Sequence, residues 1–197
     1  MSDQEAFKKL PRHEQILRRR LGKALTGFGM KIMEMMKEEL DEKKKMLEMG
    51  VRPDEESEMD DDAVERLARD YAVELEWLAE RGVECSLAWY NLAFWTGTGK
   101  ERIGYFSRAL ACVEEGKDSL PGSEPGPEWS GLHTRAECLY EIGRVHAHEG
   151  DAAVARDFLL RALPLAQEAD RLRSAAGVAH EDHLEGKIAA LLVKLPD

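Results

Sequence analysis

Four histidines in the C-terminal third of the chain are the residues best suited to metal chemistry. His180 and His183 stand three positions apart near the start of an expected helix, and His146 and His148 stand two apart on an earlier one. A zinc site needs a third or fourth protein ligand, and the zincin motif spaces its two histidines four apart. We therefore expect these histidines to lie on the surface and to bind no metal.

The segment Gly97 to Lys100, Gly-Thr-Gly-Lys, superficially resembles a phosphate-binding loop. Such a loop needs a glycine five residues before its Gly-Lys pair and a serine or threonine after the lysine, where this chain has Phe94 and Glu101. No serine or cysteine stands in a nucleophile-elbow motif, and carboxylates are too frequent for any acid–base pair to stand out. The sequence therefore predicts no cofactor, no catalytic residue and no enzymatic activity.

Three cysteines, Cys85, Cys112 and Cys138, form an odd set without a Cys-x-x-Cys pair. This spacing argues against both a disulfide framework and a zinc ribbon. We expect reduced thiols that serve as small core residues.

Composition and charge narrow the class of partner. Hydrophobic residues make up 43% and charged residues 34% of the 197 residues, which is typical of a folded helical protein. The net charge is −11, with +3 on residues 1–50 (12 basic, 9 acidic) and therefore −14 on the remainder. A body this acidic repels nucleic acid and favours a basic protein partner, although plain solubility is the stronger explanation of the charge.

The N-terminal segment has the features of neither a signal peptide nor a membrane span. It contains acids and lacks an apolar core region, and no stretch of the chain approaches the roughly 18 uncharged apolar residues of a spanning helix. The sequence predicts a cytoplasmic protein without stable membrane association.

Every strong periodic signal is helical, so the expected fold class is all-α. We expect three regions: a long amphipathic helix within residues 1–50, an acidic linker at 51–62, and a helical body at 63–197. Within the body we predict helices at about 62–81, 84–96, 100–115, 132–149, 151–173 and 181–195, with a proline- and glycine-rich loop at 117–131. Short connections between these helices favour antiparallel neighbours.

The long first helix is expected over about 12–48. Its apolar positions recur at steps of three or four and predict one buried face over six turns: Leu17, Leu21, Leu25, Phe28, Ile32, Met36 and Leu40. The same helix carries Arg18, Arg19, Arg20 and Lys23 beside several methionines. This mixture suits an anionic surface or an adaptable groove, but packing on the body or on a second copy of the chain is the stronger interpretation.

Residues 136–163 resemble one tetratricopeptide repeat, a helical hairpin of about 34 residues. The match rests on residues at the spacings of that pattern: Leu139, Ile142, Gly143, His146, Ala155, Leu159 and Ala162. His146 and Leu159 stand where the family has aromatic residues, and no proline closes the repeat. The small residues Gly143, Ala155 and Ala162 would let the two helices approach closely.

A second, degenerate unit precedes it at about 84–116, while the clear one extends over about 136–165. Ala93 and Ala109 are 16 residues apart, against 19 for Gly143 and Ala162, so the turn is three residues shorter. A pairing of helix 62–81 with helix 84–96 is the alternative. The resemblance implies antiparallel hairpins stacked as a short α-solenoid that exposes the first helix of each hairpin on a concave side, and it implies no activity.

Candidate partner-binding residues follow from the aromatic cluster on helix 84–96 and from the first helix of the clear repeat. We expect them to be Trp89, Tyr90, Trp95, Tyr140, Arg144 and His148. Trp89, Tyr90 and Trp95 cannot all face inward on a helix with about 100° per residue, so at least one remains available to a partner.

The sequence thus favours a protein-binding module, such as an adaptor, a chaperone or a cognate inhibitor of the immunity type directed at a basic toxin. The alternative is a structural or regulatory homo-oligomer, for example a homodimer, assembled through the N-terminal helix. Its apolar steps are nearer 3.6 than 3.5 residues, which counts against a long supercoil. An enzyme or metalloprotein is the least favoured class.

Overall fold

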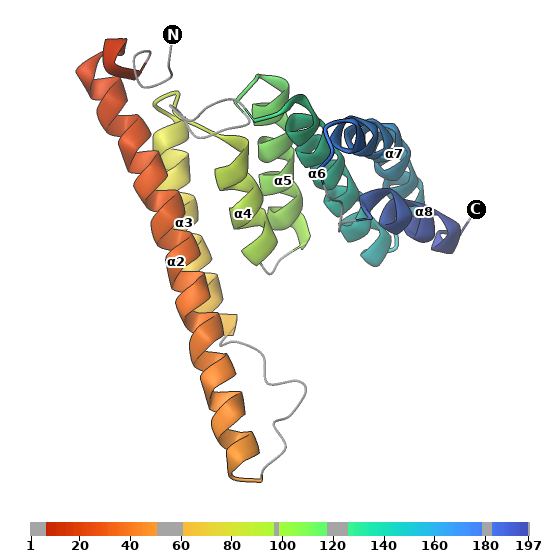
Figure 1. The fold of residues 1–197 in the computed structure, drawn as a ribbon, viewed down its shortest axis with the longest axis horizontal. Coiled ribbons are helices and arrows are strands. Elements are labelled where there is room, and N and C mark those ends of the chain that lie inside the picture. Colours follow the sequence, from red (N-terminus) through yellow and green to blue (C-terminus); the bar gives the residue numbers. More distant parts are fainter. Residues whose placement is uncertain (1–6, 51–60, 97–98, 118–125, 179–182, 197) are drawn as a thin grey trace. The chain divides into compact units, whose positions relative to one another are not determined.

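The computed structural model describes residues 7–50, 61–96, 99–117, 126–178 and 183–196. Every regular element in these ranges is an α-helix, which confirms the predicted all-α class for the described chain (Figure 1). The chain divides into two compact units. Residues 12–83 form the first, called the hairpin unit below, and residues 84–197 form the main part of the second, called the helical body.

Some predictions fall outside the described residues. They concern most of the acidic linker at 51–62, residues 118–125 of the loop at 117–131, and the residues Gly97, Thr98 and His180. Among the helices that are described, none is both long enough and apolar enough to cross a membrane.

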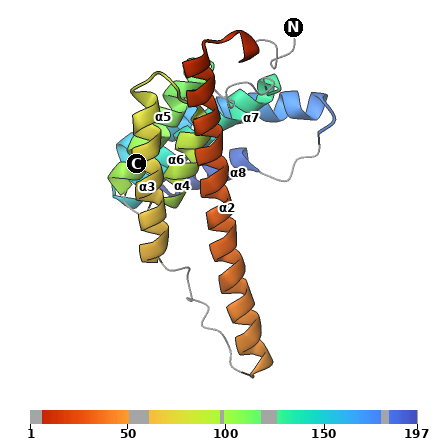
Figure 2. The same cartoon turned by 90° about the vertical axis from the view of Figure 1, so that its left-hand side faces the viewer.

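The hairpin unit consists of α2 (Arg12–Glu48) and α3 (Asp61–Ala79). Their buried residues are spaced at three or four along each helix, as expected for two amphipathic helices that share a core: Leu21, Leu25, Phe28 and Ile32 on α2, and Val64, Ala68, Tyr71, Ala72, Leu75 and Leu78 on α3. The rings of Phe28 and Tyr71 stack with centroids 4.3 Å apart. Since Arg20 of α2 meets Trp77 of α3, the two helices run antiparallel (Figure 2).

Polar contacts strengthen the hairpin on one side of this core. The Arg20 guanidinium donates hydrogen bonds to the Glu74 carboxylate and lies 4.1 Å from the centre of the Trp77 ring. The Arg81 guanidinium also lies over that ring, at 3.8 Å. Stacked and bidentate arginine contacts of this kind contribute more than an isolated surface ion pair.

Two features of the hairpin unit differ from the sequence-based expectation. The sequence predicts that the helix at 62–81 belongs to the repeat body, whereas the structure groups it with α2. The Tyr71 ring stacks on Phe28 of α2, and the Glu74 carboxylate accepts a hydrogen bond from Arg20 of α2. The apolar face of α2 was expected to stay buried through Leu40, but Met36 and Leu40 are exposed. Because the two helices are antiparallel and Phe28 lies opposite Tyr71, the first residue of α3 lies alongside about residue 38 of α2. The part of α2 after this point is therefore not covered by α3.

The helical body contains α4 (Ser86–Trp95), α5 (Gly99–Glu114), α6 (Glu128–His148), α7 (Ala152–Ala175) and α8 (Leu184–Lys194). Each helix packs against the next one along the chain, and the contact between α6 and α7 is the most extensive. The expected helices therefore occur within a few residues of their predicted ends. The start of α6 is the exception: it begins at Glu128, inside the expected loop and directly after Pro127. An acid such as Glu128 is favourable in the first turn of a helix.

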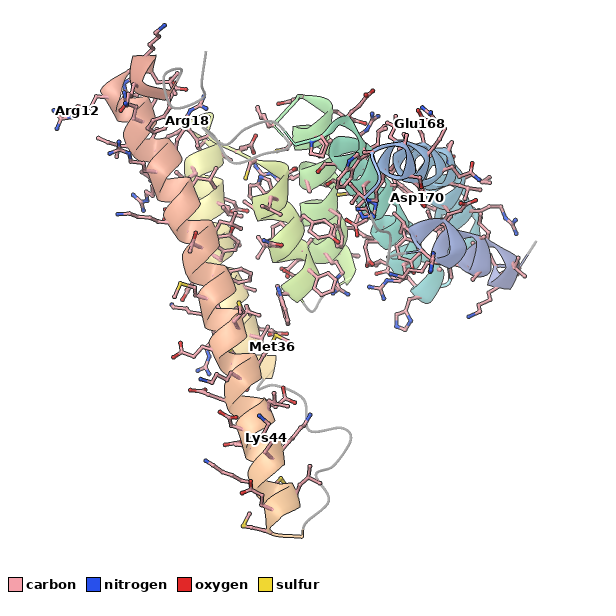
Figure 3. The ribbon with its side chains drawn as sticks, viewed as in Figure 1. Arg12, Arg18, Met36, Lys44, Glu168 and Asp170 are labelled. Atoms are coloured by element: carbon pink, nitrogen blue, oxygen red, sulfur yellow. The ribbon has the colours of Figure 1, made fainter. Side chains whose placement is uncertain are left out.

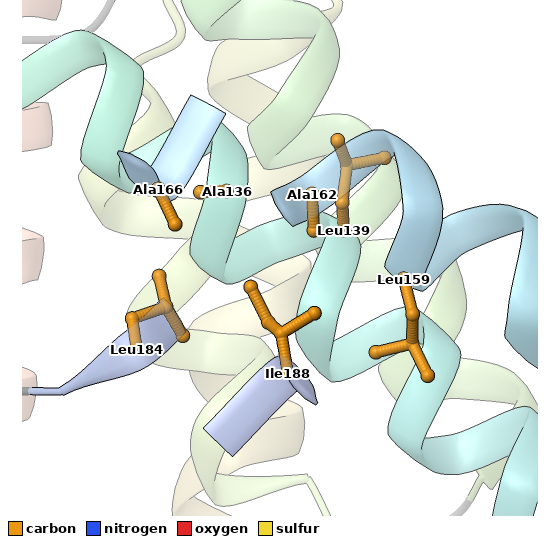
Figure 4. Packing of buried hydrophobic residues seen from close by; sticks show 7 residues of the cluster. All are labelled: Ala136, Leu139, Leu159, Ala162, Ala166, Leu184 and Ile188. Carbon is orange, nitrogen blue, oxygen red and sulfur yellow. The ribbon is translucent and has the colours of Figure 1, made fainter. Parts of the chain in front are cut away.

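Small residues of α7 allow α6 and α8 to share one core with it (Figure 4). The buried cluster combines alanines with larger aliphatic side chains: Ala136, Leu139, Leu159, Ala162, Ala166, Leu184 and Ile188. Alternating small and large side chains interdigitate without voids, which is what three helices that meet around one core require.

Gly143 marks the closest approach of α6 and α7. A Cβ atom at this position would lie 3.0 Å from Leu159 Cγ and 3.2 Å from the backbone oxygen of Ala155. Both neighbours are fully buried, so neither has free space to retreat into. The close approach expected from the small residues is therefore present at Gly143.

We predict that Gly143→Val lowers the free energy of unfolding by about 2 kcal/mol, because the added atoms overpack the contact between α6 and α7. Gly104→Val on α5 is the matched control, since nothing lies within 4 Å of a Cβ atom there and the change should stay within about 0.5 kcal/mol. Urea denaturation followed by circular dichroism measures both. Equal stability of the two variants would contradict the proposed close contact.

Candidate partner-binding face

Trp89 of α4 belongs to the core of the helical body. It is only 1% exposed, its ring lies 5.9 Å from that of Tyr105, and the Arg108 guanidinium covers it at 4.2 Å. Of the three aromatic residues predicted on this helix, Trp89 is therefore the inward-facing one, and its ring is not available to a partner.

The other face of α4 carries an apolar ridge formed by Leu87, Tyr90 and Phe94. These residues are spaced by three and four, so they lie along one side of the helix. Leu87 is 42% and Phe94 is 48% exposed, and Tyr90 is partly buried between them. Trp95 is half-buried and stands about 140° around the helix from Tyr90.

A polar row on α6 is formed by Glu137, Glu141, Arg144 and His148, spaced by four, three and four. Arg144 and His148, two of the predicted partner-binding residues, are exposed. Tyr140 lies elsewhere: it packs against the buried cluster shared by α6, α7 and α8. The structure thus places Arg144 and His148 in one row and leaves Tyr140 mainly with a packing role.

Tyr90 joins the ridge on α4 to the row on α6. Its hydroxyl lies near the Glu137 carboxylate, and its ring meets Phe106 edge to face at 5.6 Å. Burial raises the pKa of Tyr90 well above its usual value, and the negative charges of Glu137 and Glu141 raise it further. Both carboxylates therefore lie close to the Tyr90 hydroxyl.

Each carboxylate of the row has a second partner on α6. Glu137 lies 3.4 Å from Nε2 of His133, and Glu141 accepts hydrogen bonds of 2.9 and 2.6 Å from Arg144. The carboxylate of Glu141 is mostly shielded while the guanidinium of Arg144 remains accessible. Charge-assisted bonds of this length hold the side chains in fixed positions.

Arg102 of α5 forms hydrogen bonds with the C-terminal end of α4. Its guanidinium donates to the carbonyl oxygens of Ala93 (3.0 Å) and Phe94 (2.7 Å), which belong to the last turn of α4, where no further helical turn supplies N–H donors. A cation at the carbonyl end of a helix is favourable. Burial lowers the pKa of Arg102, the charge of Arg144 lowers it further, and Glu141 opposes this change, so Arg102 lies close to the α6 row.

We call the ridge, the row and Arg102 together the α4–α6 face. It combines the exposed apolar side chains of Leu87 and Phe94 with charged side chains that have defined partners. Among the described residues, no group of three or more histidine, cysteine or acidic side chains could hold a metal ion. His183 lines an open pocket with Asp170 and Glu185.

The three thiols lie inside the helical body. Cys85, Cys112 and Cys138 are free and buried. Burial raises the pKa of all three, to about 12 for Cys112. Because a thiolate is the nucleophilic form, these cysteines are unreactive at neutral pH.

No protein-family model, curated protein or solved structure matches this chain. The case for its function therefore depends on the residues themselves. Sequence reasoning named Tyr90, Arg144 and His148 of the α4–α6 face but missed Leu87 and Phe94. Leu87 and Phe94 stand three and four residues from Tyr90, so they lie on the side of the helix that Trp89 does not occupy. This spacing could have indicated them.

We predict that Tyr90 makes stability depend on alkaline pH. Its pKa is higher in the folded than in the unfolded chain, where it is about 10. The folded state therefore holds the proton more tightly, and the stabilisation that is present below about pH 10 is lost as the pH rises above it. Tyr90→Phe should lose less stability than the parent protein between about pH 9 and 11, as measured by urea denaturation at each pH. Parallel pH profiles would contradict the burial of Tyr90 beside these carboxylates.

Proposed function

We propose that the helical body is a protein-binding module that holds a segment of another protein on the α4–α6 face. The observation that carries this proposal is the exposed ridge of Leu87 and Phe94 beside positioned charges. An exposed aromatic ring and a leucine on the same side of a helix gain free energy when a partner covers them.

The polar part of the face favours a defined geometry over a general apolar association. Arg144 has accessible donors although Glu141 already orients it, and Arg102 fixes the end of α4. Side chains that are held in place before binding lose little entropy when a partner arrives. A peptide or helix that buries apolar side chains on Leu87 and Phe94 and accepts a hydrogen bond from Arg144 fits this arrangement.

The repeat architecture is part of the same proposal. We infer a short stack of the tetratricopeptide type, in which α4 with α5 and α6 with α7 are successive hairpins and α8 is a cap. The order in which neighbouring helices pack and the close contact at Gly143 support it. In such a stack, α4 and α6 are the first helices of their hairpins, and Tyr90 and Glu137 meet between them.

The chain's net charge of −11 favours a basic partner. An adaptor, a chaperone or the inhibitor of a basic toxin would each use this charge, because opposite charges speed association. We propose a non-catalytic role in each case, and a partner whose binding weakens as salt screens these charges.

We predict that Leu87→Ala with Phe94→Ala weakens partner binding at least about tenfold, since the two truncations remove the apolar centre of the contact. The partner is first captured from the native host with the full-length protein, identified by mass spectrometry and purified. Titration calorimetry with the purified partner then compares the variants at low and moderate salt.

Leu160→Ala on α7 is the matched control, because Leu160 is 56% exposed but lies outside the α4–α6 face. Its affinity should equal that of the parent protein. Unchanged affinity of the double variant, or an equal loss in the control, would contradict the assignment of this face. Circular dichroism confirms that each variant is folded.

A further inference from the structure

The hairpin unit has an apolar surface that its own core does not use. Beyond Ile32, four large apolar side chains of α2 are substantially exposed: Met33 (71%), Met36 (50%), Leu40 (54%) and Leu47 (59%). Figure 3 shows Met36 on this half of α2, together with Lys44 near its end. Single exposed apolar residues are ordinary, but four on one helix form a continuous surface.

These residues belong to a stripe that has its own period. Gly22, Gly29 and Met36 follow one another at seven-residue steps, and so do Met33, Leu40 and Leu47. At about 100° per residue all six lie within about 60° of one another, beside the buried stripe of Leu21 to Ile32 rather than on it. We call this set the side stripe. A seven-residue repeat is the period with which two helices wrap around each other.

The side stripe has one flat half and one half with large side chains. Nothing lies within 4 Å of a Cβ atom built at Gly22 or Gly29, so no packing within the described chain requires glycine there. Glycine in a helix interior costs about 1 kcal/mol relative to alanine. A second helix that approaches α2 closely at these two positions would account for both glycines.

We propose that two copies of this chain pair through their side stripes in antiparallel orientation. In one such register, Gly29 lies opposite Leu40 of the second copy. The same register places two further pairs opposite each other, Gly22 with Leu47 and Met33 with Met36, because the two residue numbers of each pair add up to 69. Large side chains of one copy then fill the flat half of the other. A parallel pairing in register would set glycine opposite glycine and leave voids.

Charges on the outer border of the stripe agree with this orientation. In the same register, Lys23 lies near Glu48 of the second copy, and Lys37 lies near its Glu34. Opposite charges beside an apolar seam select partner and orientation in paired helices. Each contact occurs twice, since an antiparallel pair of identical helices has two-fold symmetry.

The length of α2 also favours a second copy as the occupant. In the described residues, α3 runs beside α2 only up to about residue 38, so α2 extends for about ten residues beyond it. These ten residues continue an existing helix, but most helical stability in proteins comes from packing of an apolar face, and within the described residues α3 does not cover this part. Pairing would cover Leu40 and Leu47 in this extension.

The test is the oligomeric state of the full-length protein, measured by sedimentation velocity over a dilution series. We expect twice the chain mass of 22.2 kDa at high concentration and dissociation on dilution. Gly29→Leu should raise the dimer dissociation constant at least about tenfold, because the new side chain meets Leu40 of the second copy. Adding Leu40→Ala to Gly29→Leu should restore the dimer by exchanging the large and small residues.

Gly27→Leu is the matched control. Gly27 also has nothing within 4 Å of a Cβ atom, but it lies about 150° around α2 from the side stripe, so this variant should remain dimeric. A monomer at every concentration would overturn the proposal, and so would a dimer that Gly29→Leu and Gly27→Leu leave equally stable.

Cross-linking tests the orientation. With Gly29→Cys and Leu40→Cys together, mild oxidation should link the two copies, whereas Leu40→Cys alone should not. The native cysteines are buried and do not compete. Efficient linking through Leu40→Cys alone would indicate parallel helices and overturn the antiparallel pairing.

Discussion

The close packing of α6 on α7 is the contact on which the helical body depends. Because Gly143 has no side chain, α6 approaches Leu159 and the Ala155 carbonyl directly, and α8 packs against the core that α6 and α7 share. With α6 held there, its opposite side presents Glu137, Glu141 and Arg144 toward α4 and α5. The proposed recognition surface thus lies on the side of α6 that faces away from its close contact with α7.

The sequence was most informative where periodicity alone decides the structure. The spacing of apolar residues predicted the helices of the body, since an amphipathic pattern requires no knowledge of the partner helix. It was less informative about which helices pack together. Helix 62–81 has the same kind of pattern as its neighbours, and only the contact of Tyr71 with Phe28 assigns it to α2. Met36 and Leu40 continue the spacing of Ile32 although α3 begins too late to cover much of that stretch.

The candidate face also combines features that helix periodicity predicts with features that depend on how the helices pack. That one aromatic residue of helix 84–96 stays accessible follows from helix geometry, but its identity does not. Phe94 is exposed and Trp89 is buried because Tyr105 and Arg108 of α5 cover Trp89. The carboxylates of Glu137 and Glu141 are two among many acids in the sequence. Only their proximity to Tyr90, which depends on how α4 and α6 pack, distinguishes them.

The position of Trp77 has a practical consequence. The chain has four tryptophans, and three of them, Trp89, Trp95 and Trp129, belong to the helical body. Trp77 alone belongs to the hairpin unit, where Arg20 and Arg81 both lie over its ring. Indole fluorescence responds to nearby cations and to solvent. A protein that keeps only Trp77 would therefore give an optical signal from the hairpin unit alone.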